Sequence, residues 1–143
     1  MVAVEDKKGY INNNTGKEIT PIKYDKGYIF VNGLAAVELN KKFGYINALG
    51  KEITPIKYDV GSNFVNGFAI VELNKKFGYI NALGKEITPI KYDKGYVFSN
   101  GLAVVELNKK FGYINALGKE IIPIKYDHAA EFEAGFAIVK LNN

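Results

Sequence analysis

Apolar residues in this chain come in runs of four to six that are rich in Ile, Val, Tyr and Phe, and Gly, Asn, Asp and Pro separate the runs. Short apolar runs bounded by turn-forming residues predict β-strands rather than helices. Within one such run, Ala103, Val105 and Leu107 would share one face of an extended segment, while Glu106 would lie on the other. The pattern therefore predicts an all-β protein.

The strand pattern repeats along the chain at a spacing of about 34 residues, which is typical of repeat architectures. The segment KKFGYINALGKEITPIKYD begins at Lys41 and at Lys75, and it returns at Lys109 with Ile122 in place of Thr. We expect a single domain, residues 1–143, that consists of four antiparallel β units. The expected units are residues 1–40, 41–74, 75–108 and 109–143.

Each unit is expected to hold three strands. In the third copy these are residues 102–107, 111–115 and 119–124, joined by tight links at 108–110 and 116–118. Pro123 near the end of the third strand lacks a backbone donor, so this strand should lie at a sheet edge.

A recurring set of aromatic and glycine residues is expected to form the structural core of the repeats, with one phenylalanine after each connector acting as a plug between sheets. The predicted core residues are Phe30, Phe43, Phe64, Phe77, Phe98, Phe111, Phe132, Gly44, Gly78 and Gly112. Four further glycines, Gly33, Gly67, Gly101 and Gly135, should permit a turn into the next strand.

The recurring pattern of lysine, aromatic, Gly-Tyr-Ile-Asn, then Gly-Lys-Glu, Pro, Tyr-Asp and Phe-x-x-Gly-x-Ala resembles the bacterial WG repeat over nearly the whole chain. Phe43, Phe77 and Phe111 stand where that family has its tryptophan, and the first unit has Lys8-Gly9. The resemblance implies a bacterial protein with a β-rich, propeller-like or superhelical array that acts as an interaction module. It implies no catalytic residue.

The number of copies does not decide whether the array closes into a ring. The hairpin occurs four times, whereas the strand that resembles Val105-Glu106-Leu107 occurs five times, at residues 2–6, 35–40, 69–74, 103–108 and 137–142. A β-propeller-like ring and an open β-solenoid or superhelix are both compatible with this count.

Composition narrows the classes of function. The 143 residues are 48% hydrophobic and contain no cysteine, so a packed core without disulfides is expected. We expect a soluble chain, because it has no apolar run of about 18 residues and no signal peptide at its start. The compartment is not identified.

The net charge of +4 comes from dispersed lysines without any arginine, and we therefore expect neither nucleic acid nor membrane as a partner.

Candidate chemistry is sparse. The lone histidine, His128, lies in a connector, and no nucleophile motif or phosphate loop is present. We expect no enzymatic activity and no cofactor. A metal site is conceivable at the recurring aspartates Asp25, Asp59, Asp93 and Asp127, which would bind a hard cation such as calcium if they met on an axis. The competing interpretation, which we favour, is that each carboxylate accepts backbone hydrogen bonds at the turn after the third strand.

These observations favour a non-enzymatic scaffold for protein–protein interaction or self-assembly. A multivalent glycan-binding module is the alternative, because the 10 tyrosines and the recurring Asn and Asp residues suit sugars. An engineered or recently amplified array without a selected ligand is the third possibility, because residues 41–74 and 75–108 differ at only six positions. All six differences fall in two windows, residues 60–70 and 94–104, where ligand contacts on connectors are common.

Overall fold

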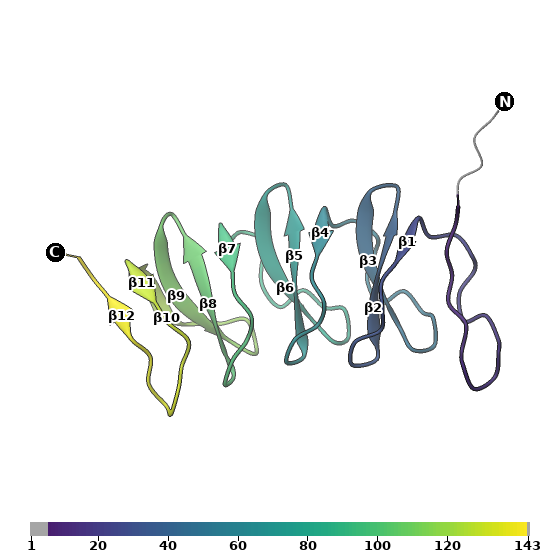
Figure 1. Cartoon of the computed structure of the whole chain (residues 1–143). Coiled ribbons are helices and arrows are strands. Elements are labelled where there is room, and N and C mark those ends of the chain that lie inside the picture. Colours follow the sequence, from purple (N-terminus) through teal and green to yellow (C-terminus); the bar gives the residue numbers. More distant parts are fainter. Residues whose placement is uncertain (1–5, 143) are drawn as a thin grey trace. The chain divides into compact units, whose positions relative to one another are not determined.

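The computed structural model describes residues 6–142, which form short β-strands and no helix (Figure 1). No helix that could cross a membrane therefore occurs in this part of the chain. The strands are β1 (Lys26–Gly27), β2 (Leu34–Leu39), β3 (Lys42–Asn47), β4 (Val60–Gly61), β5 (Phe68–Leu73), β6 (Lys76–Asn81), β7 (Lys94–Gly95), β8 (Leu102–Leu107), β9 (Lys110–Asn115), β10 (Glu120–Tyr126), β11 (His128–Ala129) and β12 (Val139–Lys140).

The strands form four small antiparallel sheets, and none of these closes on itself within residues 6–142. The predicted all-β class and the fourfold repetition are thereby confirmed. Contacts group the chain into two compact units, residues 1–63 and 64–143, and each is described by itself below. The predicted strand at residues 2–6 falls almost entirely outside the described residues.

A two-strand hairpin is the constant part of each repeat. In β8–β9 the paired residues run from Leu102 opposite Asn115 to Leu107 opposite Lys110, and β2–β3 and β5–β6 have the same register. Asn108 and Lys109 form the turn with φ angles of 52° and 65°. Two successive positive φ angles suit the right-handed twist of a hairpin. The link is thus one residue shorter than the sequence predicted.

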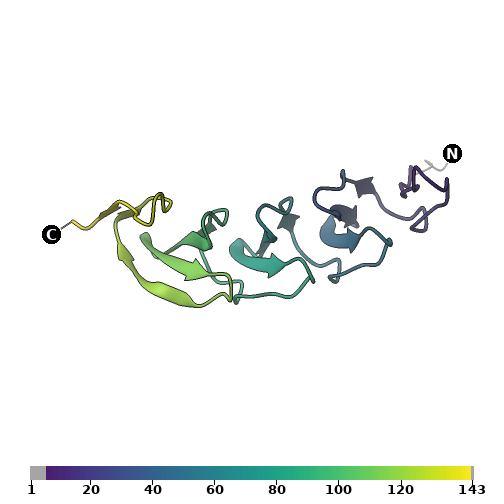
Figure 2. The same ribbon diagram turned by 90° about the horizontal axis from the view of Figure 1, so that it is seen from below.

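The third strand of the repeat forms fully only in the last hairpin. There β10 lies at the edge of the sheet beside β9, as expected (Figure 2). In the preceding repeat only isolated bridges remain, and the Oγ1 atom of Thr88 accepts a 3.3 Å hydrogen bond from the backbone N–H of Tyr79. Ile122 replaces this threonine and has no side-chain acceptor, and it pairs with Tyr113 as a member of β10.

Tyrosines dominate the fully buried core. The tyrosines that are less than 2% exposed are Tyr24, Tyr45, Tyr58, Tyr79, Tyr92 and Tyr113. Their hydroxyl groups tolerate burial because they find acceptors: Tyr79 donates to the backbone oxygen of Tyr96 at 2.6 Å, and Tyr113 donates to that of Ala130 at 2.6 Å. Of the phenylalanines expected in the core, Phe64 and Phe98 are buried. The others, which are half-buried, are Phe30, Phe43, Phe77, Phe111 and Phe132.

The glycine that follows each recurring phenylalanine allows two backbone segments to approach closely. A Cβ atom on Gly112 would lie 2.7 Å from the carbonyl oxygen of Ile122, and one on Gly44 would lie 3.0 Å from the Cα atom of Ile56. Gly44, Gly78 and Gly112 are all buried, as expected. Any side chain at these positions would push the third segment of the repeat away from its hairpin.

Consecutive repeats of the second unit are joined by side chains. The amide of Asn66 donates to the carbonyl oxygen of Phe98 at 2.7 Å, and Asn100 makes the same bond to Phe132 at 2.6 Å. The ring of Phe68 stacks on that of Phe98 with 4.2 Å between centroids. Within the second unit, successive repeats therefore pack against each other, as expected for a repeat array.

Candidate functional site

The recurring aspartates are engaged in structural contacts rather than gathered in one site. Asp93 pairs with the ammonium group of Lys76, and its other oxygen accepts a 2.8 Å hydrogen bond from the backbone N–H of Asn108. The hydrogen bond from Lys76 is the main cause that lowers the pKa of Asp93, and the bond from Asn108 adds to it. Asp25, Asp59 and Asp127 likewise pair with lysines, Lys7, Lys42 and Lys110.

This geometry corrects the predicted role of the carboxylates in one respect. Asp25 and Asp93 do accept backbone hydrogen bonds, but the donor is the hairpin turn 15 residues further along, not the turn beside the aspartate, and Asp127 accepts from Asn142, which follows β12. Within residues 6–142, no three His, Cys, Asp or Glu side chains lie close enough together to hold a metal ion. The sequence missed this contact because the aspartate and the turn meet only after β7 pairs with β8.

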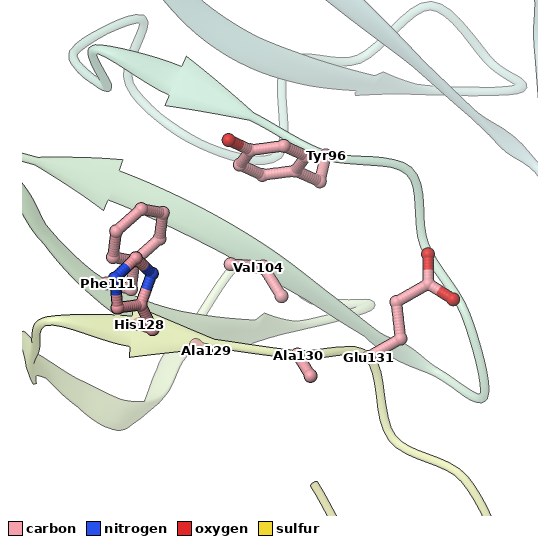
Figure 3. A pocket seen from close by; sticks show the side chains of 7 residues that line it. All are labelled: Tyr96, Val104, Phe111, His128, Ala129, Ala130 and Glu131. Atoms are coloured by element: carbon pink, nitrogen blue, oxygen red, sulfur yellow. The ribbon is translucent and has the colours of Figure 1, made fainter. Parts of the chain in front are cut away.

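A small open slot, the C-terminal slot, lies in the second unit and has a volume of about 330 Å³ (Figure 3). The residues that line it are Tyr96, Val104, Phe111, His128, Ala129, Ala130 and Glu131. In Figure 3 the ring of Tyr96 lies across the slot from the segment that carries His128, and Val104 lies between them. Glu131 stands at the far end from the Phe111 and His128 rings, which stack with 6.2 Å between centroids.

Backbone contacts hold the walls of the C-terminal slot in place. The N–H of Tyr96 donates to the carbonyl oxygen of Val104 at 3.1 Å, and the N–H of Ala130 donates to that of Ile138 at 3.0 Å. The side chain of Val104 is buried, whereas Tyr96 is 42% exposed. Because the frame depends on backbone groups, the exposed side chains of the slot can vary without loss of the fold.

The first unit contains a related space, the N-terminal slot, with a volume of about 180 Å³. It is lined by Tyr28, Ala36, Phe43, Gly61 and Asn63. Tyr28 and Phe43 stack with 5.9 Å between ring centroids. These two residues correspond to Tyr96 and Phe111 two repeats later, but no lining residue of the N-terminal slot carries a charge.

Some of the variable positions of the repeat line the slots. Tyr96 and Val104 in one slot and Asn63 in the other belong to the windows in which the copies differ, whereas Phe43 and Phe111 belong to the constant frame. The sequence analysis identified the two variable windows but not the slots. One repeat position could have indicated the slots, because it is aromatic in alternate copies: it holds Tyr28 and Tyr96 in two of them and Ser62 and Ala130 in the others.

The remaining sequence candidate, His128, is exposed and belongs to β11. It contributes a ring to the C-terminal slot, and the lining of that slot contains no serine, threonine or cysteine. The geometry therefore offers His128 an aromatic partner, Phe111, rather than a nucleophile to activate.

Comparison with protein families gives four successive matches to one model, described as WG containing repeat, at residues 9–43, 43–77, 77–111 and 111–143. The matched segments meet at Phe43, Phe77 and Phe111. A comparison with curated proteins finds no match. Because the four matches together span residues 9–143, the chain belongs to the family of proteins with WG-containing repeats.

Proposed function

We propose that this protein is a non-enzymatic scaffold for protein–protein interaction or self-assembly, and that other proteins bind at the slot of each unit. One observation carries the proposal: the repeat combines a constant buried frame with variable, partly exposed side chains around Phe43 and Phe111. Binding residues are commonly placed in this way, on connectors that a rigid scaffold positions.

Links between repeats support this role. The bonds from Asn66 to Phe98 and from Asn100 to Phe132 keep successive connectors of the second unit in a fixed relation. A partner that contacts two neighbouring connectors therefore meets a surface that is ordered before binding, which lowers the entropic cost of association.

We propose that the repeats form either a propeller-like ring or an open β-solenoid or superhelix. Both arrangements fit the side-chain links of the second unit, which join one repeat to the next, so the closure of the array is the property to measure. Small-angle scattering tests it: a compact domain of 143 residues should have a radius of gyration of about 14–15 Å, and an open array a clearly larger one.

Glycan binding is the second candidate, and the slots themselves favour it. Tyr96 and His128 combine ring faces with hydrogen-bonding groups, and Glu131 adds a carboxylate at the rim. Sugars are recognised by such combinations of apolar and polar groups in small concave sites.

A pair of binding screens with the same labelled protein separates the two candidates. A random peptide display library should yield binders, and a glycan array should give no signal. The double variant Tyr28→Ala and Tyr96→Ala should lose the selected peptides while it keeps the β-sheet circular dichroism spectrum. Glycan binding that the double variant loses would replace the protein-interaction proposal, and the absence of any ligand in both screens would favour an amplified array without a selected ligand.

A further inference from the structure

We infer that the C-terminal slot receives the ammonium group of a lysine side chain from a partner polypeptide. The inference rests on the proposed function and adds a chemical class of ligand to it. It follows from three properties of the lining: its charge, the placement of its rings and its apolar residues.

The charge of the lining selects for a cation. Glu131 is the one acidic residue that lines the slot, and no lysine is among the seven lining residues. In a chain whose 19 lysines outnumber its 15 acidic residues, a slot lined by a carboxylate and no lysine is a local site of attraction for an ammonium group.

The aromatic rings of the slot also attract a cation. Tyr96 lies on one side of the slot, and the stacked pair of Phe111 and His128 lies on the other (Figure 3). The face of an aromatic ring carries partial negative charge and attracts a cation within about 6 Å of its centre. Rings on opposite walls suit a compact head group, whereas a sugar ring stacks best on one broad, open face.

The apolar part of the lining suits a flexible apolar stem that ends in a charge. Val104, whose side chain is buried, lines the slot together with Ala129 and Ala130. A lysine side chain has a stem of four methylene groups that favours such contacts while its charged end stays partly hydrated. The volume of about 330 Å³ accommodates one such side chain.

The N-terminal slot provides an internal comparison. It keeps the Tyr28 and Phe43 rings but has Asn63 as its polar residue and no carboxylate, and its volume is about 180 Å³. We therefore expect the C-terminal slot to bind the lysine side chain more tightly than the N-terminal slot.

Nuclear magnetic resonance titration of the ¹⁵N-labelled chain tests the inference. N-acetyl-lysine N-methylamide should shift the amide signals of residues 96 and 128–131 in a saturable way. N-acetyl-norleucine N-methylamide has the same stem without the charge and should bind roughly three- to thirtyfold more weakly. Glu131→Gln should weaken lysine binding by roughly two- to fivefold, whereas the matched control Glu133→Gln, in the same connector but outside the C-terminal slot, should leave it unchanged.

Variants of the rings complete the test. Tyr96→Ala should remove the shifts at residues 128–131, and Tyr28→Ala should not. Equal binding of the norleucine derivative, equal effects of Glu131→Gln and Glu133→Gln, or tighter binding of methyl glucoside or phosphocholine at these residues would each overturn the inference. If display peptides without lysine bind at residues 96–131, the inference is wrong while the protein-interaction proposal stands.

Discussion

The hydroxyl group of Tyr92 donates a 2.8 Å hydrogen bond to the Oε1 atom of Glu120, which belongs to the next repeat. The ammonium group of Lys91 lies 3.0 Å from the same oxygen and 5.3 Å from the centre of the Tyr92 ring. In the first unit Tyr24 makes the corresponding bond to Glu52 at 2.7 Å. A buried ring, a charge pair and a repeat junction thus meet in one contact that recurs along the chain.

Removal of this hydroxyl group should weaken the junction. We expect Tyr92→Phe to lower the free energy of unfolding by about 1–2 kcal/mol, because a hydrogen bond to a charged acceptor is lost while the ring stays in place. The matched control is Tyr126→Phe, where no further repeat follows among the described residues, and it should change the free energy by less than about 0.5 kcal/mol. Urea unfolding measures both, and equal losses would show that the bond to Glu120 contributes nothing.

The buried tyrosines should make the fold sensitive to alkaline pH. Burial is the main cause that raises the pKa values of Tyr24, Tyr45, Tyr79 and Tyr92 above that of a free phenol. Below a pH of about 10, tyrosine is protonated in both states. Above it, the unfolded chain releases phenol protons first, and the free energy of unfolding should fall as pH rises.

Urea unfolding at pH 8, 10 and 11 checks this dependence, and the midpoint should fall slightly between the first two values and much more between the last two. Tyr79→Phe should reduce the slope because it removes one of the titrating groups. A midpoint that does not change up to pH 11 would contradict the prediction.

Truncation of neighbouring rings in β6 should separate the fully buried core from its half-buried edge. Tyr79 is fully buried, so Tyr79→Ala should cost about 3–5 kcal/mol through the cavity and the lost hydroxyl bond. Phe77 is half-buried, so Phe77→Ala should cost roughly half as much. Thermal and urea unfolding measure both variants. A larger loss for Phe77→Ala would place the centre of the core at the phenylalanines.

Much of the fold could be predicted because local rules and the tertiary structure agree within the hairpin. Residues 102–107 alternate between two faces and form β8 with the predicted bounds, and Asn108-Lys109 supplies the turn. The third strand was less predictable. Thr88 and Ile122 differ by one side-chain acceptor, and the effect of that acceptor on strand pairing depends on the N–H group of a tyrosine nine residues away.

The candidate site was less accessible from the sequence. Tyr96, Phe111 and Glu131 lie in three different segments, and only the packing of one repeat on the next brings them to one slot. Recurrence indicated which residues build the frame, but it does not distinguish a buried ring such as Tyr79 from a half-buried ring such as Phe77. Phe77 and Tyr79 share one face of β6, so that distinction depends on how far along this face the neighbouring segments pack.

The hairpin turns offer a stabilising substitution. Lys75 has a φ angle of 66°, which is unfavourable for a residue with a Cβ atom. We expect Lys75→Gly to raise the free energy of unfolding by up to about 1 kcal/mol, since glycine adopts this conformation without steric cost. Lys85→Gly is the control, because Lys85 is an exposed lysine without a positive φ angle, and it should be neutral or destabilising. Urea unfolding would contradict the prediction if both changes destabilise equally.

Self-association should proceed through the last strand, β12. Val139 is 40% exposed although its counterpart Val105 in β8 is 0% exposed, and the neighbouring side chains of Phe136 and Ile138 are 80% and 83% exposed. β12 pairs with β11 on one side, and no strand among residues 6–142 pairs with its other side. An unpaired edge with exposed apolar side chains favours pairing with another chain.

Sedimentation velocity of the polypeptide 1–143 at several concentrations tests this expectation, and the average mass should rise with concentration. Ile138→Lys should weaken the association by about tenfold or more, because it removes apolar area from the contact and adds like charges to both copies. Leu117→Lys provides the matched control, since Leu117 is 84% exposed but stands on a hairpin turn away from a strand edge. An equal effect of the two lysine substitutions would show that net charge rather than the edge of β12 governs association, and a mass that is independent of concentration would exclude the contact altogether.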